Sequence, residues 1–161
     1  MNIKELNNLL KNNQSFLNLS HQQLNDECAT MIAQHLEKND CKTVYLNLSN
    51  NCILSGGAQH ISTAISTPKC PLKSLNLNNN FIGPQGAIAL AQALIHSKLK
   101  SLKLENNFIG PSGAIAFMSA FKNQECSLKY LYLKFNHIGP HIFHSILIAL
   151  QSTPINTFIQ F

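Results

Sequence analysis

Hydrophobic residues along this chain follow two alternating spacings. Leu75 and Leu77 lie two positions apart, and further on Ala87, Leu90 and Leu94 are spaced three and four apart. A spacing of two is typical of a short strand with one buried face, whereas spacings of three and four predict a helix with one buried stripe. This stretch is therefore expected to form a strand, a turn and a helix of about three turns.

The same pattern returns along most of the chain as an internal repeat. Segment 75–87 reads Leu-Asn-Leu-Asn-Asn-Asn-Phe-Ile-Gly-Pro-Gln-Gly-Ala, and 27 residues later segment 102–114 reads Leu-Lys-Leu-Glu-Asn-Asn-Phe-Ile-Gly-Pro-Ser-Gly-Ala. Weaker copies begin at Leu17, Leu46 and Leu131. A unit of this length cannot bury its apolar face alone, so the copies are expected to stack into a solenoid with parallel strands.

Stacked units of this kind set the domain organisation. Helices are roughly twice as thick as the ~4.8 Å spacing between strands, so we expect a curved α/β arc with the sheet on its concave side and the helices on its convex side. We expect a single domain over residues 1–161. Its predicted parts are an N-terminal capping helix at 1–13, five strand-turn-helix repeats at 14–154 and the uncapped start of a sixth repeat at 155–161.

Helix starts are marked at one position of each copy. Pro84, Pro111 and Pro140 stand where the first helical turn is expected, a place where the N–H that proline lacks would have no partner. Asp26 and Ser55 hold the same position in the earlier copies, and both are residue types that cap helix starts. The pattern thus predicts where each helix begins.

An Asn follows the strand in most copies, where the chain bends away from the sheet. Backbone donors and acceptors at such a bend lack strand partners, and an Asn side chain can both donate to them and accept from them. Losing a buried partner of this kind costs about 1–3 kcal/mol. We expect a structural ladder with no direct function, made of Asn51, Asn80, Asn107 and Asn136.

The fourth copy shows the template at Leu102, Leu104, Asn107, Ile109, Gly110, Gly113 and Ala114. This pattern resembles the leucine-rich repeat family, in its long ribonuclease-inhibitor-like subclass, and the resemblance covers residues 14–161. It implies a right-handed horseshoe fold and a protein partner bound on the concave sheet. The chain is also similar to small eukaryote-like repeat proteins that intracellular bacteria inject into host cells. Its Arg-free, Asn- and Lys-rich composition would suit an AT-rich bacterial genome.

The charged residues narrow the class of partner. The net charge at pH 7 is +5, and all twelve basic residues are Lys. Arg supplies the bidentate contacts made to guanine edges and phosphates, so its absence argues against a nucleic-acid reader. It also excludes an arginine-finger role on a GTPase. A protein partner with an acidic surface fits the positive charge better.

Motifs for catalysis or cofactor binding are missing. The chain lacks a Gly-rich phosphate loop, a nucleophile elbow and a pair of carboxylates at equivalent repeat positions. We therefore expect no enzyme activity, no cofactor and no small-molecule substrate. His137, His141 and His144 fall on a rim loop, a helix start and an outer helix face, so we expect no metal site there.

Cysteine spacing argues against a disulfide framework, because the chain has five cysteines, an odd number. Cys41, Cys70 and Cys126 hold one repeat position, five residues before the first Leu of the next strand, and Ser97 holds it in the shortened copy. We expect a column of small, partly buried thiols.

The N-terminal residues contain no apolar stretch like that of a secretory signal, and no apolar run is long enough to span a bilayer. We expect a cytoplasmic protein, or one secreted into a host cell by a route that the sequence does not show.

The candidate binding surface lies between and just after the inward-facing leucines. In the first three copies these positions hold small uncharged residues such as Asn47 and Asn76, whereas the last two copies hold aromatic and charged residues. Aromatics beside charges are typical of the energetic centres of protein interfaces. The alternative is a solvated sheet face with incidental aromatics. The predicted binding residues are Tyr45, Lys103, Glu105, Tyr130, Tyr132, Lys134 and Phe135.

A secondary patch is predicted at Phe81 and Phe108, which follow the ladder Asn in two adjacent copies. These side chains are expected at the exposed rim of the sheet. Local stacking of neighbouring rings is one interpretation, and it gains about 0.5–1.5 kcal/mol. An exposed interaction patch is the other.

Three functions remain open at this point. The first is a monomeric protein-interaction module, which could serve as a secreted bacterial effector that acts on a host protein. The second is self-assembly through the uncapped C-terminal edge, where Phe158 and Phe161 would invite strand pairing and dimerisation. The third is binding of an anionic polymer through the Lys residues, which predicts a steep dependence on salt.

Overall fold

The computed structural model describes residues 1–151 and 158–160. Within these ranges six parallel strands form one sheet in chain order. This arrangement confirms the predicted α/β solenoid. The expectations for residues 155–157 and Phe161 lie outside the described part of the chain. The strands are β1 (Phe16–Asn18), β2 (Tyr45–Asn47), β3 (Ser74–Asn76), β4 (Ser101–Lys103), β5 (Tyr130–Tyr132) and β6 (Phe158–Gln160). The helices are α1 (Ile3–Lys11), α2 (Asp26–Leu36), α3 (Ser55–Ser66), α4 (Gly83–Ala93), α5 (Gly110–Phe121) and α6 (Pro140–Gln151).

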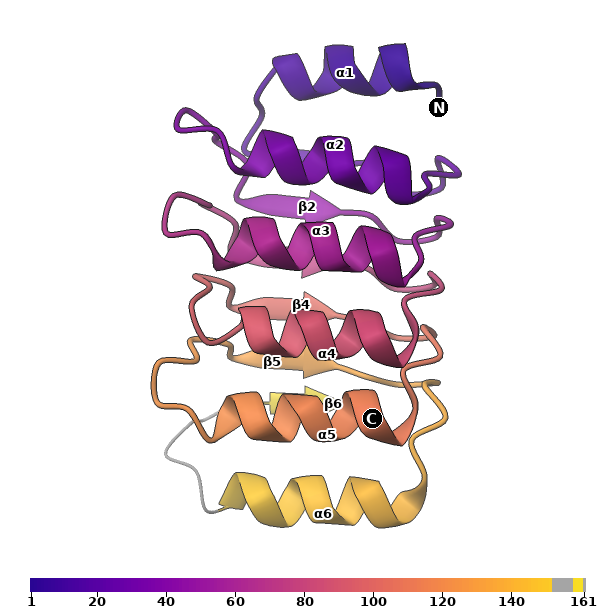
Figure 1. Ribbon diagram of the computed structural model, residues 1–161, viewed down its shortest axis with the longest axis vertical. Helices are drawn as coiled ribbons and strands as arrows, with labels where there is room; N and C mark the ends of the chain where they lie inside the picture. The colour runs from indigo at the N-terminus through magenta and orange to yellow at the C-terminus, as the bar shows by residue number, and fades with distance from the viewer. Residues whose placement is uncertain (152–157, 161) are drawn as a thin grey trace.

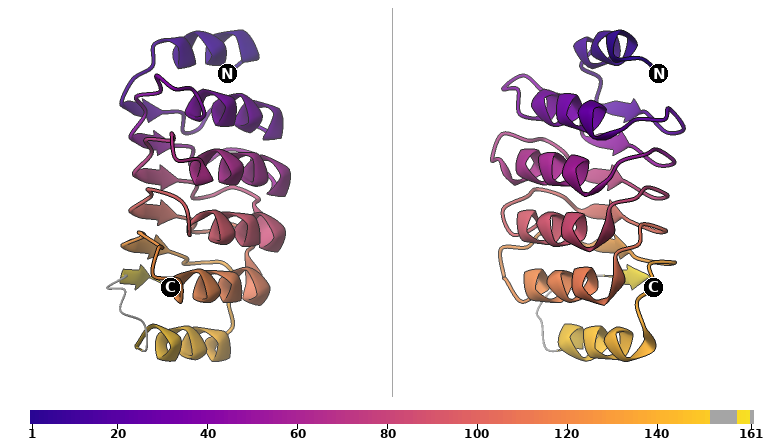
Figure 2. Two further views of the ribbon diagram at one scale, coloured as in Figure 1. Left: turned by 60° about the vertical axis from the view of Figure 1, so that its left-hand side comes forward. Right: turned by 45° about the vertical axis from the view of Figure 1, so that its right-hand side comes forward.

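Strands and helices form two layers, with the helices stacked side by side along the long axis (Figure 1). The strands line one side of the molecule and α2 to α6 line the other (Figure 2). The core lies between the layers, where Leu46, Leu75 and Leu102 of the strands are fully buried with Ala58 and Leu90 of the helices. Among the described residues, no helix is both long enough and apolar enough to cross a lipid bilayer.

Register in the sheet follows the leucine positions. Leu46 pairs with Leu75, and Leu75 pairs with Leu102, so each buried leucine lies beside its equivalent in the next repeat. The second leucine of each copy lies just beyond the three-residue strand but continues the ladder. The amide of Leu48, for example, donates to the carbonyl of Asn76 at 2.7 Å. The side chains between these leucines therefore face away from the core.

The N-terminal helix α1 lies over the first repeat, beside α2 (Figure 1). Its buried residues Leu6 and Leu10 face the core, as the helical spacing predicts. Asn2 accepts a hydrogen bond from the amide of Glu5, and the Glu5 carboxylate accepts one from the amide of Asn2. This capping box fixes where the helix begins.

Helix starts in the structure agree with the proline positions but differ at the earlier copies. Pro84 and Pro111 stand in the first turn of α4 and α5. The cap of α2 is Asn25, one residue before Asp26, and the Asp26 carboxylate instead accepts a 2.7 Å hydrogen bond from the amide of Leu54 in the next repeat. The amide at the N-cap of α3 is therefore hydrogen-bonded by a side chain of the preceding repeat. Residue spacing within one copy cannot indicate such a contact.

Asparagines at the bends join neighbouring repeats. The side-chain oxygen of Asn80 accepts from the amide of Ile53 at 3.1 Å, and its amide nitrogen donates to the carbonyls of Leu48 and Leu77 at 3.0 Å. Asn80 thus replaces the strand partners that the bend removes on both sides. The buried members of this ladder are Asn51, Asn80, Asn107 and Asn136.

Close contact between α4 and α5 explains the recurring Gly-Ala pair. A Cβ atom added at Gly113 would overlap Cγ2 of Ile109 and would lie 2.9 Å from the Cβ of Ala87. Gly86 stands in the same relation to Ala58, at 3.0 Å. Glycine at this position lets each helix approach the previous one closely.

Candidate interaction surfaces

Side chains on the concave face form columns, because equivalent residues of neighbouring repeats are paired in register. The first column runs from β1 to β6 through Phe16, Tyr45, Ser74, Ser101, Tyr130 and Phe158. The second column, two residues further along each strand, contains Asn18, Asn47, Asn76, Lys103, Tyr132 and Gln160. The side chains in the C-terminal half of the second column are larger and more varied than the three asparagines in its N-terminal half.

Lys103 and Tyr132 form a contact across two repeats on this face. The ammonium nitrogen of Lys103 lies 5.2 Å from the centre of the Tyr132 ring, within the range of a cation–π interaction. On its other side the Tyr132 ring lies 6.3 Å from the ring of Phe158, at an interplanar angle of 59°. Tyr130 precedes it on β5 and is 47% exposed. The structure thus brings aromatic rings and a cation together on β4, β5 and β6.

Glu105 is held within the same face by its neighbour. Its carboxylate accepts a hydrogen bond from the side chain of Asn78 at 2.6 Å, and its amide donates to the side-chain oxygen of Asn78 at 2.9 Å. Because both ends of this contact lie in adjacent repeats, the Glu105 side chain is positioned rather than free to reorient. It adds one fixed negative charge beside the predicted binding residues.

Phe135 is exposed in a backbone conformation that disfavours it. Its φ is +59°, in the left-handed region, and 77% of its surface is accessible. The equivalent positions hold Asn50, Asn79 and Asn106, and Asn tolerates this conformation. A bulky residue there carries a strain cost and gains little burial within the chain. Phe135 therefore contributes little to the stability of the chain.

Tyr45 lies apart from the other predicted binding residues. It belongs to β2, three strands away from β5, and its ring is stacked on Phe16 with centroids 4.4 Å apart and planes 1° apart. The structure therefore places Tyr45 in a separate aromatic pair. Phe16 is absent from the binding residues predicted from the sequence. It directly precedes a strand leucine, as Tyr45 and Tyr130 do, and this shared repeat position could have identified it as an aromatic residue of the same face.

Positive charge is concentrated in the C-terminal half of the chain. Residues 69–161 carry eight of the twelve lysines and two of the seven acidic residues. Three of these lysines lie side by side at the start of the strands, because the amide of Lys100 donates to the carbonyl of Lys73 and the amide of Lys129 donates to the carbonyl of Lys100. This lysine column borders the aromatic residues of β5.

A row of stacked rings, here called the aromatic rim, follows the ends of β3, β4 and β5. It consists of Phe81, Phe108 and His137. The ring centroids of Phe81 and Phe108 are 5.9 Å apart, as are those of Phe108 and His137. Half of the Phe81 surface and 49% of the Phe108 surface are exposed. The secondary patch predicted from the sequence therefore extends by one further ring.

Comparisons with known proteins agree with this architecture. A family model described as Leucine Rich repeat matches residues 69–91, 96–118 and 124–140. The protein folds as a leucine-rich-repeat solenoid. Among solved structures, it is similar to "Leiomodin-1 Actin-Binding Site 2 (ABS2)", with a TM-score of 0.76, 21% sequence identity, and coverage of 94% of this chain and 89% of that one. No curated protein sequence matches the chain.

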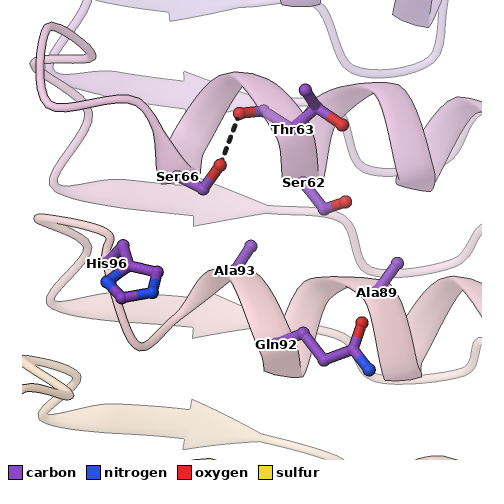
Figure 3. Close-up of a pocket in the computed structure, with 7 residues that line it drawn as sticks. All are labelled: Ser62, Thr63, Ser66, Ala89, Gln92, Ala93 and His96. Carbon is purple, nitrogen blue, oxygen red and sulfur yellow. Dashed lines mark hydrogen bonds between the residues drawn. The ribbon is translucent and has the colours of Figure 1, made fainter.

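The helical side of the leucine-rich-repeat solenoid has a hollow of about 290 Å³ between α3 and α4 (Figure 3). Its hydroxyl groups are used within their own helix, since Ser62 donates to the carbonyl of Gln59 and Ser66 donates to the carbonyl of Thr63, each at 2.7 Å. Its lining residue His96 lies 3.7 Å from the carboxylate of Glu125, with both side chains largely exposed. The hollow is lined by Ser62, Thr63, Ser66, Ala89, Gln92, Ala93 and His96.

Burial shifts the pKa of titratable groups in the leucine-rich-repeat core toward their neutral forms. Burial raises the pKa of the Cys70 and Cys126 thiols, which makes the reactive thiolate less available. Burial also lowers the pKa of His35, whose Nε2 lies 3.1 Å from the Thr43 hydroxyl and 3.6 Å from the Cys41 sulfur. Within residues 1–151 and 158–160, no three His, Cys, Asp or Glu side chains lie close enough to hold a metal ion.

Proposed function

We propose that the chain is a non-catalytic protein-interaction module that binds an acidic surface of a partner protein through the C-terminal half of its concave sheet. The observation that carries this proposal is Phe135, which is highly exposed in a left-handed conformation three residues after Tyr132, the partner of Lys103 in a cation–π contact. The binding surface comprises Lys103, Glu105, Tyr130, Tyr132, Lys134 and Phe135.

Composition and charge of this surface support the proposal. Exposed aromatic residues bordered by charges are typical of the few residues that dominate binding energy. The lysine column at the edge of the same strands would steer an acidic partner toward it, because complementary charge raises association rates. Tyr45 and Phe16 form a second aromatic pair on the same face, and an extended partner crossing the sheet would meet both.

A domain of the same fold offers a supporting example. The similar structure is named for an actin-binding site, and it spans nearly the same extent as this chain. A solenoid of this length is therefore large enough to serve protein binding. At 21% identity the likeness concerns the fold, so it supports protein binding by such a fold and does not identify the partner.

We further propose that the repeats are of the ribonuclease-inhibitor-like subclass and that the protein is a secreted bacterial effector acting on a host protein. The support for the subclass is a repeat of 27 to 29 residues with a full helix in each copy. The support for the effector role is the composition, with abundant Asn and Lys and no Arg. Affinity purification from host-cell lysate tests the second point directly.

Capture of a partner by the full chain tests the surface itself. Tyr132→Ala combined with Lys134→Glu removes one ring and reverses one charge on the proposed surface. Lys42→Glu makes the same charge reversal at an exposed position in the N-terminal half and serves as the matched control. We expect the double variant to lose partner capture and the control to retain it. Full capture by the double variant would exclude this surface.

Self-assembly through β6 is the alternative function. Phe158 begins β6 and is 54% exposed, so it would be available to a second chain. Sedimentation of the wild-type chain distinguishes the two functions. A dimer that dissociates in Phe158→Lys would favour self-assembly, whereas a monomer at high concentration would favour the interaction module.

A further inference from the structure

The three rings of the aromatic rim stand almost parallel at even intervals along the axis of the solenoid. The planes of Phe81 and Phe108 differ by 7°, and those of Phe108 and His137 by 22°. Each ring comes from a different repeat and is followed directly by the start of a helix, α4, α5 or α6. The rim is therefore a row of two phenyl rings and one imidazole ring, each of which precedes a helix N-terminus in the sequence.

These helix N-termini differ from those of α1 and α2. Helices α1 and α2 begin with side-chain caps from Asn2 and Asn25 and carry acidic residues in their first turns. Helices α4 and α5 have no side-chain cap and no acidic residue in the first turn, and α6 also lacks a first-turn acid. The partial positive charge at a helix N-terminus favours nearby carboxylates. Along the aromatic rim this charge is not offset by the chain's own acids.

One repeat position explains why the C-terminal repeats do not supply that charge themselves. The carboxylate of Asp26 accepts a hydrogen bond from the amide of Leu54 and so lies at the start of α3. The positions equivalent to Asp26 in later repeats are Ser55, Pro84, Pro111 and Pro140. Neither serine nor proline carries a carboxylate, so these repeats place no acid of this kind at the start of the following helix.

We propose that the aromatic rim docks an acidic amphipathic helix of a partner protein, lying along the solenoid axis. Four residues of an α-helix rise about 6 Å, which matches the 5.9 Å spacing of the rings. Apolar residues at positions i, i+4 and i+8 of the partner helix would each rest on one ring. Acidic residues flanking this stripe would lie near the starts of α4 and α5.

The ring spacing selects a helix over an extended strand. Residues on one face of a strand recur every 6.6–6.8 Å or so, so a strand would drift out of register by roughly 1.6 Å over the three rings. A second copy of this chain is also a poor occupant. Its residues 69–161 contain only Glu105 and Glu125 as acids, and the acids in the first turns of α1 and α2 lie at their own helix starts.

Exposure and strain set the rim apart from rings that only stack on each other. Phe108 and His137 hold φ values of +57° and +55°, in the left-handed region that a bulky residue such as Phe rarely adopts, although His tolerates it better. The gain from stacking exposed rings is small and comparable to the strain of one such residue. A bound helix that covers the rings would add the burial that the free chain lacks.

Selection from a displayed library of helical peptides on the full-length chain tests this proposal. We expect enriched peptides to carry apolar residues at i, i+4 and i+8 with Asp or Glu beside them. Binding of an enriched synthetic peptide, measured by fluorescence anisotropy, should weaken about tenfold or more in Phe81→Ala combined with Phe108→Ala. Ile115→Ala, which removes an exposed apolar side chain from the outer face of α5, is the matched control and should bind normally.

A second variant keeps the test independent of the rings. Pro111→Glu places an acid in the first turn of α5, where it should stabilise the helix while repelling an acidic peptide, so affinity should fall severalfold without unfolding. The concave variant Tyr132→Ala with Lys134→Glu should bind the peptide normally, which separates this site from the proposed concave surface. Enriched peptides without the four-residue spacing, or unchanged affinity in the rim variants, would overturn the proposal. Self-association of the wild type that is lost in Phe108→Ala would assign the rim to a second copy instead.

Discussion

The ammonium group of Lys103 on β4 lies over the ring of Tyr132 on β5, 5.2 Å from its centre. The equivalent residues of the two preceding repeats are Asn76 and Asn47. The contact therefore lies where the side chains of the concave face change from small and uncharged to charged and aromatic. An exposed cation–π contact contributes about 0.5–1 kcal/mol, too little to account for folding. Its effect is to hold a charge and a ring next to each other on the exposed face.

Phe135→Asn should change stability and binding in opposite directions. Asn is the residue at this position in the three preceding repeats, and it adopts the left-handed backbone at lower cost than Phe. We expect the free energy of unfolding to rise by about 1 kcal/mol in urea titrations. Affinity for the captured partner should fall, because the most exposed ring of the surface is removed.

The reverse substitution at an equivalent position provides the control. Asn79→Phe should lower stability by a similar amount without improving partner binding, since Asn79 lies two repeats away from Phe135. If Phe135→Asn destabilises the chain, the ring is packed against the protein and the interpretation of strain is wrong.

Asn80→Ala should destabilise the solenoid by about 1–3 kcal/mol. The change removes the acceptor for the amide of Ile53 and the donor to the carbonyls of Leu48 and Leu77 in the interior. Urea denaturation followed by circular dichroism measures the loss. Asn7→Ala on the exposed side of α1 should stay within about 0.5 kcal/mol of the wild type. Equal effects of the two substitutions would contradict the structural role of the ladder.

Gly113→Ala should be destabilising by about 1–3 kcal/mol, because the added methyl group would overlap Ile109 and crowd Ala87 between α4 and α5. Gly139→Ala is the matched control. No atom lies within 4 Å of its added Cβ, and its φ is outside the left-handed region, so we expect little change or a small gain. Thermal melts of the two variants compare the effects directly, and tolerance of Gly113→Ala would show that the helices can separate.

The free energy of unfolding should decrease as the pH is lowered, because His35 becomes protonated. Its pKa is lowered by burial, with Lys38 acting in the same direction and Asp40 opposing, so the folded chain favours the neutral ring. Its contribution is therefore fully present above the ordinary pKa of 6.5 and is lost as pH falls below that value toward the lowered one. In melts between pH 7 and pH 5, His35→Gln should show a smaller drop in Tm than the wild type.

The exposed His60→Gln is the control for the pH series. It should show the same drop in Tm as the wild type. If His35→Gln and His60→Gln lose stability equally on acidification, protonation of His35 is not the cause.

The sequence predicts the fold well because the repeat ties each structural role to one residue type. Leu46 and Leu75 are two members of a column that must be buried, and this fixes strand direction and register together. Asn80 stands at a bend where backbone groups need a side-chain partner, so its position also follows from spacing.

Contacts between repeats and backbone conformation were harder to predict. The hydrogen bond from Leu54 to Asp26 crosses from one repeat to the next, and spacing within a copy does not reveal it. The left-handed conformation of Phe135 is visible only when its backbone is known, since the residue type alone favours an extended strand. Tyr45 was predicted as the one aromatic binding residue on the N-terminal half of the face, and the structure adds that its ring stacks on Phe16.

Photo-crosslinking from the concave face tests the central claim most directly. A benzophenone amino acid would replace Phe135 in one full-length variant and the exposed Ile115 on α5 in another. After irradiation with the captured partner, we predict a covalent adduct from position 135 and none from position 115. An adduct from position 115 alone would place the partner on the helical side and contradict the account.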